Sequence, residues 1–287
     1  MKLHQVAVMS GKGGAGKTSL TAALLKLFPE VIAVDADVNA SNLPILLMPQ
    51  QLAEAEYCGM DVAQIASATC TACGKCREIC AFDAVDLFDT GEFKVNDECE
   101  GCAACAWVCP AKAVTMVPHI SGHKYVSQIK NGYMVHADLI PGEDNSGKLI
   151  ANIREDARQL AEEKQIATLV IDGPPGTSCQ AISSLTGVQL VLAVLEESLS
   201  GLSDYRRLAK LLEKFRLPHL VVVNKSGLNP TLSTEVKTAI VEHGGRMVAS
   251  IPFDAEIPKR LGRKETLLEM KAYRSVIEDV YRQILAE

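Results

Sequence analysis

The segment that most constrains the fold of this 287-residue chain is a glycine-rich loop, SGKGGAGKTS, at residues 10–19. The apolar residues before it (3–9) predict a buried strand, and the residues after its first glycines (about 16–28) predict a helix. The loop fits the pattern GxxxxGKT, in which backbone N–H groups and a helix N-terminus surround phosphate groups. A strand, a phosphate loop and a helix in this order predict the first unit of a nucleotide-binding α/β fold.

The rest of the chain alternates apolar runs with amphipathic stretches. Runs rich in Val, Ile and Leu predict strands that are buried on both faces, and the stretches between them predict helices that cover a parallel sheet. We therefore predict the α/β class, a P-loop NTPase with a mostly parallel sheet. The further predicted strands lie at 31–35, 167–172, 188–195, 218–224 and 246–251. The further predicted helices lie at about 146–164, 201–216, 231–243 and 264–286.

Composition and charge exclude several classes of function. The chain is 48% hydrophobic and 22% charged, and its formal net charge of −6 argues against general binding of nucleic acid or anionic membranes. It has no apolar run of about 18 residues, and its N-terminus lacks the basic start and long apolar run of a signal peptide. The last helix is mixed in charge, unlike a basic membrane anchor. We expect a cytoplasmic protein without a membrane anchor.

Eight of the ten cysteines lie in an internal repeat. CTACGKCREICAFDAV (70–85) and CEGCAACAWVCPAKAV (99–114) align with all four cysteines of each in register. Thiols stay reduced in the cytoplasm, so cysteines crowded in this way indicate metal binding rather than disulfides. The surrounding segment is acidic, with eight Asp and Glu against four Lys and Arg over 65–117. The predicted domains are a first segment of the α/β domain at 1–64, a cysteine-rich insert at 65–117, and a second segment of the α/β domain at 118–287.

The spacing within each repeat matches the bacterial two-cluster ferredoxin run, in which the fourth cysteine of each run binds the other cluster. Structural zinc usually takes paired CxxC units with a longer spacer, so iron–sulfur clusters are favoured over zinc. One departure is Ala81, which follows Cys80 where the pattern has proline. The predicted ligands of the first [4Fe–4S] cluster are Cys70, Cys73, Cys76 and Cys109, and those of the second are Cys99, Cys102, Cys105 and Cys80.

Charged residues at strand ends complete the predicted nucleotide site. Lys17 is expected to reach the β- and γ-phosphates, and the Thr18 hydroxyl to bind Mg²⁺. Asp172, at the end of LVIDGPPG, is expected to hold the Mg²⁺ shell, because parallel strands end at the edge where ligands bind. Asp37 is the candidate for positioning the attacking water, and Asp35 either supports the metal or forms a strand-end turn. The predicted nucleotide contacts of the loop are Gly11, Gly13, Gly14, Ala15, Gly16, Lys17, Thr18 and Ser19.

Together, GKGGAGKT, VDADVNASNL and VIDGPPGTS resemble the deviant Walker A ATPases, which include MinD, ParA, Mrp and the nitrogenase iron protein. The resemblance implies ATP and Mg²⁺ as cofactors and a homodimer with nucleotide at its interface. It implies that Lys12 reaches the partner's phosphates, like an arginine finger supplied in trans, where the alternative is a solvated loop cation. It also implies base contacts for Asn224 and Pro252, although ordinary strand-end chemistry explains both equally well.

The cysteine-rich insert after VDADVNASNL, followed by VHADLIPGEDNSGKL, resembles MinD-superfamily ATPases with an inserted ferredoxin domain. Such proteins are often labelled cobyrinic acid diamide synthase-like. The resemblance implies ATP-gated electron transfer to or from a redox protein partner. Two other functions stay open: an ATP-switched iron–sulfur carrier or assembly factor, and a positioning ATPase. The chain has no cysteine after Cys179, so it lacks the C-terminal CxxC of Mrp-type carriers.

Three smaller expectations concern residues between positions 123 and 179. Asn131-Gly132 lies between two alternating runs and predicts a β-hairpin within 123–139. Asn145 or Ser146 is expected to cap the following helix. Cys179 has the spacing from Asp172 of a cluster-ligand cysteine in the nitrogenase iron protein, but a small half-buried residue at a helix start is the favoured interpretation.

Overall fold

The computed structural model describes residues 3–143, 147–227 and 229–287. Within these residues the chain forms two compact units, one made of Met1–Ala55 and His123–Glu287 and the other of Glu56–Gly122. The smaller unit is longer at both ends than the predicted 65–117 insert. It is longer because the chain enters and leaves it through two extended strands that the sequence pattern did not reveal. The predicted helix cap, Asn145 or Ser146, lies outside the described residues.

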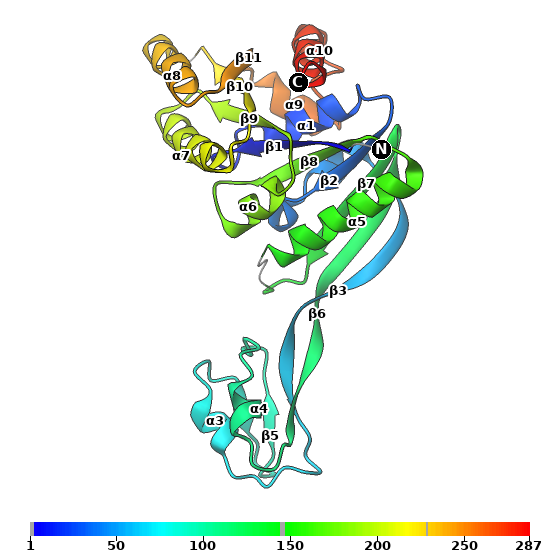
Figure 1. Cartoon of the computed structure of the whole chain (residues 1–287), viewed down its shortest axis with the longest axis vertical. Coiled ribbons are helices and arrows are strands. Elements are labelled where there is room, and N and C mark those ends of the chain that lie inside the picture. Colours follow the sequence, from blue (N-terminus) through cyan, green and yellow to red (C-terminus); the bar gives the residue numbers. More distant parts are fainter. Residues whose placement is uncertain (1–2, 144–146, 228) are drawn as a thin grey trace. The chain divides into compact units, whose positions relative to one another are not determined.

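Nine strands of the described chain form one sheet in the order β11-β10-β9-β1-β8-β2-β7-β6-β3 (Figure 1). From β11 to β7 every neighbouring pair is parallel, as the uniformly apolar strands predicted. This confirms the α/β P-loop NTPase class. The parallel strands are β1 (His4–Ser10), β2 (Val31–Asp35), β7 (Gly132–Leu139), β8 (Thr168–Pro175), β9 (Leu190–Glu196), β10 (His219–Ser226) and β11 (Arg246–Pro252).

Two strands of 16 residues each, β3 (Gln50–Ile65) and β6 (Val114–Ile129), carry the chain between the two units. A two-residue turn joins β6 to β7, at the place where Asn131-Gly132 predicted a hairpin. The Asn131 amide fixes this turn, because its Nδ2 donates hydrogen bonds to the carbonyl oxygens of Leu25 and Phe28 at the end of the first helix. These bonds satisfy carbonyl groups that a helix end leaves without a partner.

Helices cover both faces of the sheet, and alternate residues of each strand serve the two faces. Val6 and Val8 of β1 pack in one apolar cluster with α1 and α10, whereas α5 contacts β2, β7 and β8, and α6 and α7 contact β8 and β9 respectively as well as β1. The longer helices are α1 (Lys17–Leu25), α5 (Lys148–Lys164), α7 (Leu199–Phe215), α8 (Pro230–Glu242) and α10 (Lys271–Leu285). The shorter ones are η1 (Val38–Ala40), α2 (Leu43–Leu47), α6 (Cys179–Leu185) and α9 (Glu256–Leu261).

Two predicted helices are shorter in the structure. The helix predicted at 16–28 ends at Leu25, where the Asn131 bonds described above hold the chain. The helix predicted at 264–286 begins only at Lys271. Before it, Glu269 accepts hydrogen bonds from the backbone N–H and the hydroxyl of Thr266, which stabilises a turn instead of a helix.

The smaller unit has little apolar core. It contains α3 (Lys75–Ile79), α4 (Ala104–Val108) and an antiparallel pair, β4 (Val85–Leu87) with β5 (Phe93–Val95). Units of about 70 residues or fewer rarely fold on apolar burial alone and usually add disulfides or metal. No disulfide joins any of the described cysteines. The buried core residues are Ala63, Cys76, Val85, Phe93 and Val114, with Cys80, Cys99, Cys105 and Cys109 packed against them.

Candidate functional site

The glycine-rich loop lies between β1 and α1, at the carboxyl edge of the parallel strands. Gly16 precedes α1 with a φ of 94°, and no side chain caps the helix. A side chain at this position would be strained and would collide with the Asn224 amide. The first N–H groups of α1 therefore have no side-chain partner, which is the arrangement that binds phosphate at a helix N-terminus.

A cavity opens directly over this loop. Its wall includes Lys17, which is 5% exposed, together with Thr18 and Ser19 at the start of α1. Gly11 and Lys12 do not line it, and the Cα of Gly11 lies against the backbone of Asp204 in α7. The predicted nucleotide contacts that do line the cavity are Gly13, Gly14, Ala15, Gly16, Lys17, Thr18 and Ser19.

The three predicted carboxylates come together beside Lys17. The parallel register of β2 and β8 places Asp35 opposite Asp172. Lys17 Nζ lies 3.1 Å from Asp172 Oδ2 and 3.5 Å from Asp37 Oδ2. The Thr18 hydroxyl donates to Asp172 Oδ2 at 2.7 Å, so two of the three predicted Mg²⁺ residues are in contact. One lysine facing three carboxylates leaves an excess of negative charge, which a divalent cation would neutralise.

The raised pKa values of two of these aspartates also indicate an excess of negative charge in the cluster. Burial, and then the charge of Asp172, raise the pKa of Asp35 to about 7. Burial also raises the pKa of Asp37, although Lys17 partly offsets this. In the part of the chain that the structure describes, no three His, Cys, Asp or Glu side chains are arranged to hold a metal ion by themselves. Mg²⁺ usually takes one or two carboxylates together with nucleotide phosphates and water, and the Thr18–Asp172 pair fits that need.

Asp35 has a second, structural task. Its carboxylate accepts hydrogen bonds from the Ser41 hydroxyl at 2.8 Å and from the backbone N–H groups of Asp37 and Leu43. These bonds fix the segment from the end of β2 to the start of α2, which includes Asp37. Asp35 thus supports both the acidic cluster and the loop that carries the predicted water-positioning residue.

Thr21 is a site residue that the sequence reasoning missed. Its hydroxyl is fully buried and lies 2.7 Å from Asp172 Oδ1, and also 3.0 Å from the Lys17 carbonyl oxygen. Thr18 and Thr21 therefore hold the two oxygens of the same carboxylate. Their spacing along α1 was a usable signal, because residues three apart lie on one face of a helix.

A second cavity, beside the first, is mainly apolar. It is bordered by Gly14 and Gly16 of the loop and includes both predicted base contacts, Asn224 and Pro252. The Asn224 amide is already committed, because its Nδ2 donates to the Ala15 carbonyl at 2.7 Å. The apolar wall has the chemistry that receives a flat base. Its apolar side chains include Leu20, Val222, Ile251, Pro252, Phe253 and Leu267.

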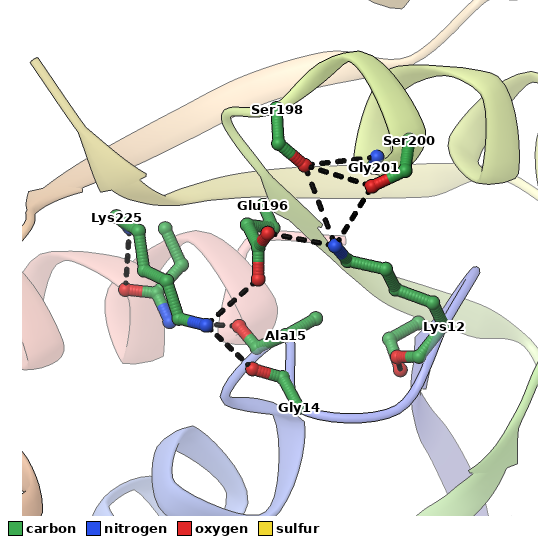
Figure 2. A network of polar contacts seen from close by, with 10 residues as sticks. Lys12, Gly14, Ala15, Glu196, Ser198, Ser200, Gly201 and Lys225 are labelled. Carbon is green, nitrogen blue, oxygen red and sulfur yellow. Dashed lines mark hydrogen bonds and ion pairs between the residues drawn. The ribbon is translucent and has the colours of Figure 1, made fainter. Parts of the chain in front are cut away.

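Glu196 forms a polar network with Lys12 of the loop and with Lys225 at the carboxyl end of β10 (Figure 2). Lys12 Nζ lies 2.7 Å from Glu196 Oε1, and Lys225 Nζ lies 2.7 Å from Glu196 Oε2. Lys225 also donates to the Gly14 carbonyl at 2.9 Å. Burial opposes ionisation of Glu196, but hydrogen bonds from Lys12, Lys225 and Ser198 outweigh this effect and lower its pKa to about 2. The sequence reasoning missed Glu196 and Lys225, although both follow apolar strands at the carboxyl edge where ligands bind.

The cysteines of the smaller unit line two separate cavities. Each cavity combines three cysteines of one repeat with the fourth cysteine of the other repeat. Backbone N–H groups point at three of the sulfurs, with Ala72 to Cys70, Ala84 to Cys80 and Ala113 to Cys109 at 3.2 to 3.4 Å. Cys70, Cys73, Cys76 and Cys109 line one cavity. Cys80, Cys99, Cys102 and Cys105 line the other.

This donor set suits a cluster better than a single ion. Each thiolate of a [4Fe–4S] cluster binds a different iron, so the sulfurs surround the cluster and do not converge on one point. A hydrogen bond from the Lys75 backbone N–H is the main reason that the pKa of Cys73 is lowered, whereas burial raises the pKa of Cys76 and of Cys105. Iron would offset that burial cost, because a metal holds a coordinating thiol in its deprotonated form.

Two further findings concern Cys179 and membrane association. Cys179 lies at the start of α6, as expected, but it is exposed rather than half-buried, and it belongs to neither cysteine cavity. No helix within residues 3–143, 147–227 and 229–287 has the length and apolar character to cross a membrane.

Comparisons with known proteins agree with this geometry. Residues 6–267 match the family described as the CobQ/CobB/MinD/ParA nucleotide binding domain. The uncharacterized protein MJ0578 of Methanocaldococcus jannaschii is 33% identical over 98% of this chain and 96% of its own. The septum site-determining protein MinD of Pyrococcus horikoshii, solved with Mg-ADP, has a TM-score of 0.58 at 17% identity, covering 98% of this chain and 96% of that one. A variant of Cyanothece McdA, solved as a complex with ATP, has a TM-score of 0.57 at 18% identity, covering 99% and 96%.

Proposed function

The chain belongs to the CobQ/CobB/MinD/ParA nucleotide-binding family, and we propose that it hydrolyses ATP to control electron transfer through two [4Fe–4S] clusters in its smaller unit. The observation that carries the proposal is the crossed grouping of cysteines in a chain that also has a phosphate-binding loop. Cys80 lies with the cysteines of the second repeat, and Cys109 lies with those of the first. This exchange is the arrangement of two-cluster ferredoxins.

The nucleotide chemistry rests on the residues around Lys17. Lys17 binds the β- and γ-phosphates of the ATP in its own subunit, and Thr18 and Asp172 hold Mg²⁺, with Asp35 in support. Asp37 orients the attacking water. The 2.7 Å contact between Thr18 and Asp172 supports the metal assignment, and the position of Asp37 on the wall of the phosphate cavity supports the role in hydrolysis. The apolar cavity beside Pro252 and Asn224 takes the adenine.

The active form in this proposal is a homodimer with nucleotide at its interface. Lys12 is the residue that acts across that interface, on the phosphates of the partner subunit. Support comes from the absence of Lys12 from the linings of both cavities at its own loop in the described part of the chain. A cation that is close in sequence to the phosphate-binding glycines but outside their cavity does not serve the phosphates of its own subunit.

The smaller unit supplies the redox function. The two groups of four cysteines would hold the two [4Fe–4S] clusters, which accept and donate single electrons when bound. Cys73 and Cys102 are exposed in these groups, so each cluster would have one corner near solvent for exchange with a partner. The small apolar core of this unit gives the clusters a second effect, because metal binding stabilises units that cannot fold on apolar burial alone.

The charge of the smaller unit favours one kind of redox partner. The smaller unit, Glu56–Gly122, has ten acidic and four basic residues, which leaves twenty-five of each sign in the rest of the chain. The whole formal charge of −6 therefore resides on the unit that carries the cysteines. We propose a redox protein with a basic docking surface, and its association rate should fall steeply with salt.

The connection between the two activities runs along the chain. Asp37 and Asn42 line the phosphate cavity, and the same segment continues through α2 into β3, the strand that leads to the smaller unit. A change of nucleotide state at Asp37 thus acts on the start of that strand. In this proposal it alters either the reduction potential of the clusters or their access to a partner.

The test is anaerobic purification followed by iron and acid-labile sulfide analysis and by ATPase assays in oxidised and dithionite-reduced states. We expect about eight irons per chain and a rate of hydrolysis that depends on cluster state. A Lys17→Ala variant is the matched control, because it should lose hydrolysis while keeping its full iron content. Hydrolysis that is indifferent to cluster state, in protein with full iron, contradicts the coupling.

A second candidate is an ATP-switched carrier or assembly factor for iron–sulfur clusters. The exposure of Cys73 and Cys102 favours it, since a transferred cluster must be reached by the thiols of an acceptor. The two candidates differ in what leaves the protein. Transfer of iron and sulfide to an apo-ferredoxin on ATP addition identifies a carrier, whereas electron delivery with unchanged iron content identifies the redox protein.

A positioning ATPase is a third candidate, because the description of the matched family includes MinD and ParA, and the fold is similar to that of the septum site-determining protein MinD. At 17% identity this likeness concerns the fold alone. Such a protein needs no cluster, so replacing the eight repeat cysteines would leave its activity intact. Loss of the redox dependence of hydrolysis in that variant would instead favour the main proposal.

A further inference from the structure

Lys12 is held within its own subunit by three acceptors. Its ammonium group donates to Glu196 Oε1 at 2.7 Å, to Ser200 Oγ at 3.0 Å and to Ser198 Oγ at 3.4 Å (Figure 2). An ammonium group has three N–H donors, so this set occupies all of them. The side chain is 27% exposed, which is too little for a cation that simply extends into water. These acceptors therefore hold Lys12 at a defined position, outside the cavity that opens over its own loop.

Glu196 is the central acceptor that holds Lys12 in this position. Its side chain is 15% exposed, and each of its two oxygens faces one lysine, Lys12 on one side and Lys225 on the other. Lys225 is fixed independently, because it also donates to the Gly14 carbonyl. If Lys12 left, Lys225 would still neutralise Glu196. The carboxylate would not be stranded without a partner, so Lys12 is the removable member of the network.

We propose that Glu196 is a positioning residue that stores Lys12 in its own subunit until a second nucleotide-loaded copy of the chain takes it up. This rests on the proposed role of Lys12 at the dimer interface. The phosphates of the partner's nucleotide offer Lys12 several negative charges in place of one carboxylate, so the exchange is favourable only when that nucleotide is present. Glu196 thereby makes dimer formation depend on nucleotide.

The size of the effect follows from the exposure of the pair. A partly exposed ion pair contributes only modestly, and breaking one costs about a factor of three in an equilibrium constant. A symmetric dimer releases two Lys12 side chains, so the two costs multiply. Removing the charge of Glu196 should therefore tighten the nucleotide-dependent dimer by about tenfold.

The experiment uses the full chain, loaded with its clusters, and Mg²⁺ with a non-hydrolysable ATP analogue, with sedimentation measured over a range of protein concentrations. Glu196→Gln keeps the shape and one acceptor but removes the charge, and we expect about a tenfold lower dimer dissociation constant. The affinity of the monomer for the analogue should stay the same, since Glu196 does not line either cavity of the loop. Ser200→Ala, which removes one weaker acceptor, should tighten the dimer less.

A double-mutant cycle with Lys12→Ala separates the possible failures. If Glu196 acts through Lys12, Glu196→Gln should have no effect in the Lys12→Ala background. An unchanged or weaker dimer with Glu196→Gln, while Lys12→Ala weakens dimerisation, would overturn the storage role alone. A Lys12→Ala protein that dimerises like the wild type would overturn the interface role of Lys12, and the storage role with it. Tightening by Glu196→Gln that persists without Lys12 would also overturn the inference.

Discussion

The pKa of Asp35 predicts that the nucleotide-free protein loses stability as the pH rises towards neutral. Asp35 is 1% exposed at the end of β2, and burial, followed by the charge of Asp172, raises its pKa from 3.8 to about 7. Between these two values the folded protein holds a proton that the unfolded chain has released. The stabilisation is therefore complete below pH 3.8 and is lost as the pH rises through about 7.

The magnitude follows from the size of the pKa difference. The pKa of Asp35 in the folded protein lies roughly three pH units above its ordinary value, and each pH unit corresponds to about 1.4 kcal/mol. Ionisation of Asp35 therefore lowers the free energy of unfolding by at most on the order of 4 kcal/mol. The hydrogen bonds from Ser41 and from the Asp37 N–H oppose the shift and are already contained in it. The loss should be spread almost evenly between about pH 4 and pH 7, at about 1.4 kcal/mol per pH unit.

The assay is urea unfolding of the nucleotide-free protein in EDTA, followed by far-ultraviolet circular dichroism, at several values between about pH 5.5 and pH 8. The matched control is Asp35→Asn, which removes the titration but keeps the size of the side chain. We expect the wild type to lose stability across this range and Asp35→Asn to lose much less. Mg²⁺ with nucleotide should flatten the wild-type profile, because the cation favours the ionised carboxylates. Parallel profiles for the two proteins would refute the reasoning, since Asp35 would then be ionised throughout.

Three further predictions concern the cysteine cavities and the acidic cluster. Cys80→Ser should halve the iron content, from about eight to about four per chain, with loss of the cluster of the second repeat, and loss of the first cluster instead would contradict the crossed grouping. Thr21→Val should lower kcat several-fold with little change in KM, because Asp172 loses one of its two hydroxyl contacts; an unchanged kcat counts against it. Lys75 borders one cysteine cavity and Glu100 the other, so Lys75→Ala should lower the reduction potential of the first cluster and Glu100→Ala should raise that of the second. Redox titration followed by electron paramagnetic resonance measures both shifts, and equal shifts at both clusters would contradict the assignment.

Features set by neighbouring residues could be predicted from the sequence. The strand, loop and helix around Lys17 could be predicted because apolar periodicity and the glycine pattern act over a few residues. The parallel sheet followed from uniformly apolar strands, and the hairpin at Asn131-Gly132 followed from turn chemistry. The strands β3 and β6 could not be predicted in this way. Much of β3 is exposed on both faces, so its residues carry no alternation of polar and apolar side chains.

The contacts of Lys12 show why a site is harder to predict than a fold. A motif states which residue type stands at a position, but the partners of that residue come from distant segments. Glu196 lies 184 residues from Lys12 in the sequence, and the parallel pairing of β1 with β9 brings the two together. Glu196 occupies the last position of its strand, the same place as Asp35 in β2. A charged residue that ends an otherwise apolar parallel strand is therefore as strong a signal as the motif itself. The strand places its carboxylate at the ligand edge even where no known pattern includes it.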